Sequence, residues 1–172
     1  YGGDWRGRGR FLTETLEEVR KVWPEHLPLT ARFGVIEFDG RDEETLVESI
    51  ALVNEFKVRG LDMLNVSIGF STIKGKTPWA EGFMAPYAGR LRRETGLPVA
   101  TAWCIDGPEV ANAAVEKGEL DLVMIARAHL ADPHYPYAAA RALGEEKPAW
   151  VLPAPYAHWL SRYRGIGKAA AQ

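Results

Sequence analysis

Residues Leu29–Gly34, LTARFG, form the first of four short apolar segments that together decide the fold of this chain. Each segment has the length and composition of a buried strand, and each carries one polar or large residue towards its end. The other three segments are Leu61–Gly69 (LDMLNVSIG), Pro98–Cys104 (PVATAWC) and Leu120–Ala128 (LDLVMIARA). Short apolar segments separated by helical patterns indicate a parallel sheet that is covered by helices on both faces.

Helical patterns occupy the stretches between these segments. Residues 1–9 are rich in glycine and arginine and are expected to form a loop. The apolar spacing that follows predicts a helix ending at Trp23, because the residue before a proline avoids the helical region. Asp42 is expected to cap the next helix and Gly60 to end it. The inner face of that helix is expected to carry Leu46, Ile50, Val53 and Phe56. Further helices are predicted over 84–95, from 107 to 118, and from 132 towards 143.

The number of strands limits the possible folds. Four strands are too few to close an eight-stranded barrel, and an open sheet would leave two long apolar edges. We therefore expect an α/β fold that is half of a (β/α)8 TIM barrel, completed by a second chain or by a second copy of this one. A complete flavodoxin-like domain is the alternative, although such sheets typically have about five strands. Residues 1–147 would form the half-barrel, and residues 148–172, rich in proline and aromatic residues, a tail over the active site.

The composition excludes several classes of protein. With 172 residues, of which 47% are hydrophobic, the chain can form one domain with a real core. A net charge of -2 argues against a nucleic-acid surface, and no apolar run is long enough to span a membrane. The single cysteine excludes an internal disulfide bond. The chain lacks a signal peptide and begins with Tyr1 as if cut from a longer protein, so we expect a cytoplasmic location.

The residues near the strand ends are the candidates for function, because the carboxyl ends of the strands build the active site of a parallel barrel. They are Arg32, Ser67, Trp103 and Arg127. A phosphate-bearing ligand facing these ends would meet two guanidinium groups. A buried guanidinium such as that of Arg32 needs an anion or several acceptors. The alternative partners are a carboxylate inside the barrel for Arg32 and the carboxyl end of a helix for Arg127.

Several motifs in order resemble the Old Yellow Enzyme family of flavin oxidoreductases, and most closely its xenobiotic-reductase branch. The opening YGGDWRGRGRFLTETLEEVR is similar to a family signature, and LPLTARFG resembles the fifth strand of the family barrel. The segment LDLVMIARAHLADPHYPYAAARALG resembles the eighth strand with its helix, and LPAPYAHWLSRYR resembles the tail of the branch. The resemblance covers nearly the whole chain and implies the carboxyl-terminal half of the family's barrel.

The resemblance also implies an activity. Family members hold FMN at the mouth of a (β/α)8 barrel and pass a hydride from NAD(P)H, through the flavin, to the β-carbon of an activated alkene. The chain would carry strands five to eight. The amino-terminal half, which supplies the substrate-binding histidine pair and the tyrosine proton donor, is absent, so the catalytic residues of this chain are unknown. The expected partners are that half-barrel or a second copy in a homo-oligomer, and a small enone or xenobiotic alkene.

The resemblance assigns cofactor roles to five residues. Arg32 would face the N1/C2=O edge of the flavin, where negative charge develops on reduction. Ala126 and Arg127 match the pair that grips the FMN phosphate. Ser67 matches a position near the ribityl chain or the ring edge, although a serine at a strand end is often a turn former. Trp103 would line the pocket, joined by Trp159 from the tail, although core packing is the alternative for any tryptophan.

Four positions depart from the family pattern. Cys104 and Asp106 stand in a segment that is rich in glycine in the family, Ala126 replaces a glycine, and Gly7 replaces an asparagine. Ala126 is acceptable if its φ angle is negative. Asp106 either caps the next helix or opposes the phosphate charge and weakens FMN binding. For Cys104 a buried apolar role is favoured over a nucleophilic one.

Other polar groups are expected to be structural. His129, His134 and Asp132 lack the spacing of helical metal ligands, so no metal is expected. Lys74 and Lys76 are expected in a solvated loop, with contact to a dinucleotide phosphate as the alternative. Two other functions stay open: a non-catalytic, self-associating barrel fragment with at most a residual phosphate or FMN site, and a phosphate-binding isomerase. The isomerase would need a carboxylate or lysine base at a strand end, which the four positions lack.

Overall fold

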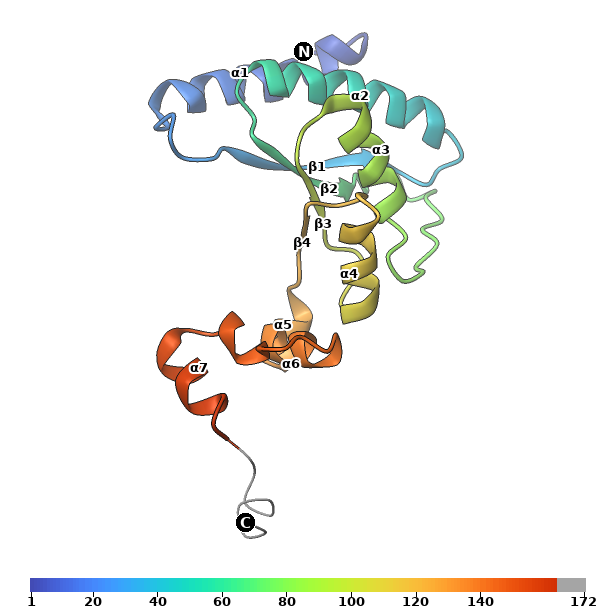
Figure 1. Cartoon of the computed structure of the whole chain (residues 1–172). Coiled ribbons are helices and arrows are strands. Elements are labelled where there is room, and N and C mark those ends of the chain that lie inside the picture. Colours follow the sequence, from blue (N-terminus) through green and yellow to red (C-terminus); the bar gives the residue numbers. More distant parts are fainter. Residues whose placement is uncertain (164–172) are drawn as a thin grey trace, which may run out of the picture. The chain divides into compact units, whose positions relative to one another are not determined.

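The computed structural model describes residues 1–163, in which parallel strands alternate with helices (Figure 1). The strands form one four-stranded sheet in the order β1-β2-β3-β4, and every neighbouring pair is parallel. This sequential order is that of part of a TIM barrel and differs from a doubly wound sheet, in which the order reverses. The strands are β1 (Thr30–Ile36), β2 (Met63–Ile68), β3 (Val99–Thr101) and β4 (Leu122–Val123).

The helices connect and follow these strands. They are α1 (Trp5–Val22), α2 (Asp42–Val58), α3 (Ala85–Thr95), α4 (Pro108–Glu116), α5 (Arg127–Ala131), α6 (Tyr135–Ala142), the 3-10 helix η1 (Pro148–Val151) and α7 (Ala154–Leu160). No helix of the described part is both long and apolar enough to cross a bilayer. Residues 164–172, the end of the expected tail, lie outside the described residues.

The chain divides into two compact units, each of which is described by itself. The first comprises Tyr1–Ile105 with Val110–Met124 and holds the whole sheet. Of the described residues, the second comprises Asp106–Glu109 with Ile125–Tyr163 and holds α5, α6, η1 and α7. The functional division expected at residue 147 stays a prediction.

The core of the first unit lies between α2 and the sheet. The four residues predicted for the inner face of α2 are all buried, and so are Leu64 and Val66 of β2. The ring of Phe33 in β1 meets that of Phe56 in α2 edge to face, with 5.6 Å between centroids. Burying each such side chain contributes about 1.5–3 kcal/mol, so this layer is a principal source of stability.

Helix α1 begins earlier than the sequence predicted, because residues 5–9 are helical rather than a loop. The Asp4 carboxylate accepts a hydrogen bond from the backbone N–H of Gly7 at 2.8 Å, which caps the helix despite its glycines. Gly9 is buried against Leu52 of α2, and a Cβ at Gly9 would collide with the Leu52 side chain. The glycine therefore allows α1 and α2 to pack closely, and the two helices lie side by side in Figure 1.

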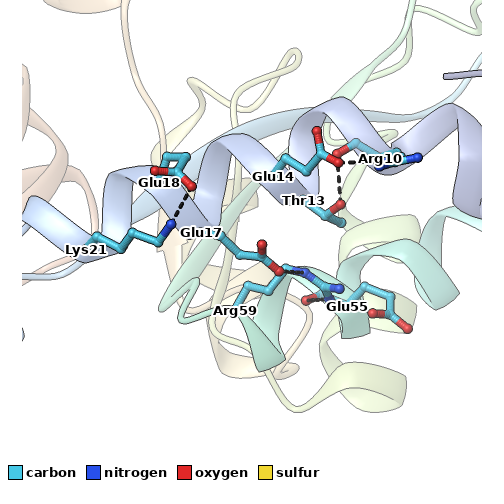
Figure 2. A network of polar contacts seen from close by, with 8 residues as sticks. All are labelled: Arg10, Thr13, Glu14, Glu17, Glu18, Lys21, Glu55 and Arg59. Atoms are coloured by element: carbon cyan, nitrogen blue, oxygen red, sulfur yellow. Dashed lines mark hydrogen bonds and ion pairs between the residues drawn. The ribbon is translucent and has the colours of Figure 1, made fainter.

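An ionic network joins the exposed surfaces of these two helices. Arg59, which follows α2, donates from Nε to Glu17 of α1 at 2.7 Å and from Nη1 to Glu55 of α2 at 2.5 Å (Figure 2). On α1 itself, Arg10 is bound to Glu14 and Lys21 to Glu18. Exposed ion pairs of this kind each contribute little to the free energy of unfolding. The network therefore only supplements the packing of α1 against α2 around Gly9.

The helix ends follow the sequence prediction more closely than the helix starts. Gly60 and Gly96 take left-handed φ angles of +89° and +65°, as residues that end a helix do. At the start of α2, however, Arg41 is the N-cap residue and Asp42 is the first helical residue, so the predicted cap is wrong by one position. The helix predicted from residue 132 instead begins at Tyr135 as α6, because the Asp132 carboxylate accepts the N–H of His134 and forms a turn, and the short helix α5 precedes that turn where no helix was predicted.

The strand ends also differ from the prediction. β1 continues beyond Gly34 to Ile36, because Val35 and Ile36 are completely buried. β4 is limited to Leu122–Val123, although a strand was predicted over residues 120–126. The second strand, predicted over residues 61–67, lies instead at Met63–Ile68, and the third, predicted over residues 99–103, ends earlier, at Val99–Thr101.

An aspartate fastens β1 to β2 where both strands begin. The Asp62 carboxylate accepts the N–H of Leu29 at 2.7 Å and a hydrogen bond from Arg20 of α1 at 2.6 Å. The N–H of Asp62 in turn donates to the carbonyl oxygen of Leu29 at 2.9 Å. One side chain thus ties a helix and two strands together.

The same arrangement recurs where β3 and β4 begin. The Asp121 carboxylate accepts the N–H of Val99 at 2.9 Å and two hydrogen bonds from Arg92 of α3, at 2.9 and 3.0 Å. The N–H of Asp121 donates to the carbonyl oxygen of Val99 at 3.0 Å. We call these two groups the aspartate clamps, and they fasten the sheet in pairs of strands.

Candidate functional site

Arg32 lies in the middle of β1, as the third of seven residues, and not at its carboxyl end as predicted. It is opposite Asn65 in the register of the β1–β2 pair, and Asn65 is opposite Ala100 of β3. Residues opposite each other in a sheet point to the same face. Phe33 points to the other face, where it meets α2. Arg32 and Asn65 therefore lie on the face of the sheet that is opposite to α2.

Polar side chains of β1 and β2 meet an aromatic ring on this face. Arg32 Nη1 donates a long hydrogen bond of 3.5 Å to Asn65 Oδ1, and its guanidinium carbon lies 5.8 Å from the ring centroid of Trp103. Ser67, two residues after Asn65, accepts a hydrogen bond from Trp103 Nε1 at 3.3 Å. Asn65 and Ser67 are buried, with exposed fractions of 9% and 5%. We call Arg32, Asn65, Ser67 and Trp103 the polar row.

The structure thus brings together three of the five residues that were expected to bind a cofactor. Asn65 is the member that sequence reasoning did not assign, although it stood in the quoted segment. The signal that could have identified it is the period of two along a strand, which places Asn65 and Ser67 on the same face. The cofactor roles of these residues stay predictions.

Arg32 is exposed rather than buried, so the prediction of a buried guanidinium is wrong, and among the described residues it has no carboxylate partner. Within residues 1–163 neither Arg32 nor Arg127 forms a salt bridge, so no carboxylate of the described residues pairs with Arg32. The arginines that do pair with a carboxylate are Arg8, Arg10, Arg20, Arg41, Arg59, Arg90 and Arg92. The positive charge of Arg32 is therefore available to an anionic or carbonyl-bearing ligand.

Cys104 follows Trp103 in a conformation that favours glycine. Its φ angle is +48°, and its carbonyl oxygen accepts the N–H of Gly82 at 2.6 Å. A left-handed backbone is a conformation that glycine adopts most readily, so Cys104 is strained here. Cys104 is partly buried and packs against the core cluster, as the apolar interpretation expected.

Gly7, another departure from the family pattern, lies in the first turns of α1. A Cβ at Gly7 would collide with the carbonyl oxygen of Gly2. The N–H of Gly2 also donates to the carbonyl oxygen of Gly7 at 3.1 Å. The lack of a side chain at Gly7 therefore leaves room for the first residues of the chain to fold back on the helix.

The two residues expected at the phosphate lie in the second unit. Arg127 is the first residue of α5 and is exposed, and Ala126 precedes it as the N-cap residue. The φ angle of Ala126 is −119°, so the methyl group that replaces a glycine hydrogen causes no backbone strain. Trp159 lies in α7 with 72% of its surface exposed, and its role in a pocket stays a prediction.

Asp106, also in the second unit, does not cap α4. The helix begins at Pro108, so the residue before it is Gly107, and the predicted cap is wrong. Asp106 is exposed, and its backbone carbonyl oxygen accepts the hydroxyl of Tyr135 at 2.5 Å. Burial raises the pKa of Tyr135, and the charges of Asp106 and Glu109 raise it further. The Asp106 carboxylate thus adds negative charge near the start of α6.

The histidines of this unit take part in packing contacts. The ring of His129 lies 5.5 Å from that of Tyr135, and the N–H of His134 is bound by Asp132. Among the described residues no three His, Cys, Asp or Glu side chains are grouped so that they could hold a metal ion.

Known proteins resemble this chain in sequence over most of its length. The chain is 33% identical over 144 residues to the NADPH dehydrogenase of Geobacillus thermodenitrificans, an alignment that covers 84% of this chain and 41% of that protein. It is 28% identical over 144 residues to the NADH oxidase of Thermoanaerobacter brockii, covering 81% of this chain and 22% of that protein. The chain thus spans about two fifths of the NADPH dehydrogenase and less of the oxidase.

A solved structure shows the same fold. The 2-naphthoyl-CoA reductase in complex with 2-naphthoyl-CoA superposes with a TM-score of 0.71 at 22% identity, over 86% of this chain and 22% of the reductase. The sequence profile of the NADH:flavin oxidoreductase / NADH oxidase family matches residues 1–146. The chain therefore belongs to this family, that of the Old Yellow Enzymes.

Proposed function

We propose that this chain is the carboxyl-terminal half of an FMN-dependent NAD(P)H oxidoreductase of the xenobiotic-reductase branch, which reduces the activated C=C bonds of enones or xenobiotics. The family uses FMN and NAD(P)H. The observation that carries the proposal is the polar row, in which an arginine without a carboxylate partner lies beside buried Asn65 and Ser67 and over Trp103.

The polar row fits the ring end of FMN. A guanidinium donor, an amide and a hydroxyl on one face of the sheet match the carbonyl and nitrogen edge of an isoalloxazine. When bound, FMN would carry a hydride from NAD(P)H to the alkene. Arg32 would stabilise negative charge at that edge, and Asn65 would hold the guanidinium in place. Trp103, fixed through its Nε1 to Ser67, offers an aromatic face to a flat conjugated substrate.

The phosphate end fits less well. Arg127 and the backbone at Ala126 would bind the phosphate, and the negative φ of Ala126 is compatible with that role. The Asp106 carboxylate would oppose the same phosphate. At a separation of about 5 Å and an effective dielectric constant of about 20, the repulsion is on the order of 3 kcal/mol per unit charge. We therefore expect this chain to bind FMN more weakly than a variant with glycine in place of Asp106 would.

Completion of the barrel is part of the proposal. Strands β1 and β4 each have one neighbour in the sheet, so each has an edge that another strand could join. We propose that a complementary amino-terminal half-barrel joins these edges, supplying the substrate-binding histidine pair and the proton donor. A second copy of the chain is the other occupant of the edges, and it would make a homo-oligomer.

A second function is favoured by the departures from the family pattern. Cys104 and Asp106 stand in a segment that, by the resemblance, is rich in glycine in the family, and the charge of Asp106 would reduce the affinity for FMN. In this alternative the chain is a non-catalytic, self-associating barrel fragment with at most a residual phosphate or FMN site. It would be colourless after purification and would sediment as a dimer.

An FMN titration tests the first proposal. Arg32→Ala is expected to weaken FMN binding at least tenfold, measured by the quenching of flavin fluorescence and the shift of the visible spectrum. Arg93→Ala is the matched control, because Arg93 is an exposed arginine of α3 outside the polar row. Absence of FMN binding by the unmodified chain, both alone and with the amino-terminal half added, would favour the fragment instead.

A further inference from the structure

An aromatic surface adjoins the polar row, and two of its residues come from the loop between β2 and α3. The ring centroid of Phe70 lies 5.4 Å from that of Trp103, and the ring centroid of Trp79 lies 5.8 Å from that of Trp103. Both pairs pack edge to face. Phe70 and Trp79 are 53% and 58% exposed, although both are large apolar residues. We call Phe70, Trp79 and Trp103 the aromatic wall.

Backbone strain is concentrated around this wall. Within residues 1–163 the non-glycine residues with a positive φ are Phe38, Phe70, Trp79 and Cys104, at +55°, +54°, +41° and +48°. Two of them belong to the wall and one follows Trp103 directly, while Phe38 joins the same ring cluster through Phe83, 5.7 Å away. A bulky residue in the left-handed region is unfavourable and persists only when its surroundings impose it, which is typical of functional sites.

Glu37 is the main side-chain anchor of the loop. It directly follows β1, and its carboxylate accepts both the backbone N–H of Ser71 at 3.0 Å and the Ser71 hydroxyl at 2.6 Å. A Cβ at Gly69 would collide with the same carboxylate, which shows how closely the loop approaches it. The backbone adds further anchors, since the N–H of Lys76 donates to the carbonyl oxygen of Phe38 at 2.7 Å. The bond to Ser71 fixes the residue next to Phe70.

We propose that Phe70 and Trp79 form, with Trp103, a wall that determines specificity for planar conjugated substrates, and that Glu37 is the positioning residue that holds this wall in place. The inference deepens the proposed function, because it names the class of substrate that the site beside Arg32 would take. Phe70 and Trp79 are more than half exposed beside Trp103, so their rings are free to pack against another aromatic ring. A saturated ring of the same size has no π system and fills this aromatic surface poorly.

A pair of matched ligands tests the wall. Cinnamamide is planar and conjugated, and 3-cyclohexylpropanamide has the same number of heavy atoms without conjugation. Calorimetric titration of the full chain in the presence of FMN is expected to show about tenfold tighter binding of cinnamamide. In the Phe70→Ala/Trp79→Ala variant the difference should fall to about twofold or less. Trp23→Phe, a change at the end of α1 and outside the wall, should keep the full difference.

A second measurement tests the role of Glu37. Rings that are held in fixed mutual orientation give a near-ultraviolet circular dichroism signal, and Trp79 and Trp103 are such a pair. Glu37→Ala is expected to lose most of this signal and the preference for cinnamamide, while the far-ultraviolet signal is retained. Ser71→Ala, which keeps its backbone N–H, should lose only part of both, and it serves if Glu37→Ala fails to fold. Glu44→Ala removes an exposed carboxylate of α2 and should change neither.

The outcomes separate this inference from the proposed function. Equal binding of the two amides by the unmodified chain, or an unchanged preference in Phe70→Ala/Trp79→Ala, overturns the wall. An unchanged near-ultraviolet signal in both Glu37→Ala and Ser71→Ala overturns the positioning role. If FMN does not bind but the preference for cinnamamide is present and depends on Phe70 and Trp79, the wall is upheld and the flavin part of the proposed function fails.

Discussion

Arg32 of β1 and Asn65 of β2 lie opposite each other in the sheet, and the guanidinium donates to the amide oxygen over 3.5 Å without any carboxylate nearby to neutralise it among the described residues. The hydrogen bond is long, so it orients the arginine more than it binds it. A charge that is oriented but not neutralised is suited to a ligand that brings its own negative charge.

The first prediction concerns Asn65. Asn65→Leu fills the same space but removes the acceptor, so the Arg32 side chain should lose its orientation. The affinity for FMN is expected to fall about five- to tenfold, with a change of less than about 1 kcal/mol in the free energy of unfolding. Flavin fluorescence titration and urea denaturation measure the two effects. Wild-type affinity in Asn65→Leu would show that Asn65 does not orient the guanidinium.

The second prediction concerns the phosphate end. Asp106→Gly removes a negative charge and is expected to raise the affinity for FMN about tenfold or more. Riboflavin lacks the phosphate, so its affinity should stay the same and provides the matched control. A parallel gain for both flavins would mean that the effect of Asp106 is not electrostatic repulsion of the phosphate.

The third prediction concerns the contact between α1 and α2. Gly9→Ala places a Cβ against Leu52 and is expected to destabilise the chain by about 1–3 kcal/mol, measured by urea denaturation. Leu52→Ala removes the atoms that collide. In a double-mutant cycle the loss from Gly9→Ala should therefore become much smaller in the Leu52→Ala background. Equal losses in both backgrounds would locate the effect of Gly9→Ala elsewhere.

The fourth prediction concerns the second aspartate clamp. Asp121→Ala leaves the N–H of Val99 and the guanidinium of Arg92 without their acceptor and is expected to cost about 1 kcal/mol, because the site is partly exposed. Asp121→Asn keeps one acceptor for Val99 and should cost less. Glu18→Gln, at an exposed pair on α1, should have no measurable effect. Unchanged urea denaturation of Asp121→Ala would contradict the clamp.

The fifth prediction is the pH dependence of both clamps. The hydrogen bond from Arg92 and then that from Val99 lower the pKa of Asp121, and the backbone of Leu29 and then Arg20 lower the pKa of Asp62. A lowered pKa in the folded state stabilises the chain above the unfolded value of about 3.9 and ceases to do so as the pH falls through the folded value.

The test compares the wild type with Asp62→Asn/Asp121→Asn across the acid range. The difference in their free energies of unfolding should be constant above about pH 5 and should shrink as the pH falls below about 4. Comparing the two chains removes the contribution of the other carboxylates. A difference that is independent of pH would mean that the charge of the clamps is not what stabilises the fold.

Much of the fold could be predicted from the sequence, because apolar periodicity reports burial directly. The alternation of the four strands with α1 to α4, the inner face of α2 and the helix-ending glycines Gly60 and Gly96 were predicted correctly, whereas α5, η1 and α7 were not predicted. Element ends were predicted less well, because they depend on single contacts. The cap of α1 by Asp4 and the turn at Asp132 each rest on one hydrogen bond, which no periodicity reveals.

The candidate site shows the same contrast. Arg32, Ser67 and Trp103 were selected from strand positions, and the structure brings them together on one face. Phe70 and Trp79 could not be selected, because they lie on an irregular loop whose course depends on the Glu37 carboxylate. Strands carry their neighbours in a fixed register, whereas a loop takes its position from contacts that are distant in the sequence.

The aspartate clamps have a consequence for how such a chain can be divided. Asp62 joins β1 only to β2, and Asp121 joins β3 only to β4, so neither clamp spans the loop between β2 and α3. A protease nick within residues 71–79 would leave both clamps whole and each fragment with its own fastened strand duplex. Adding strands to a protein of this kind, or removing them, is therefore least disruptive in steps of two. A cut between β1 and β2 would separate Asp62 from Leu29 and break the first clamp.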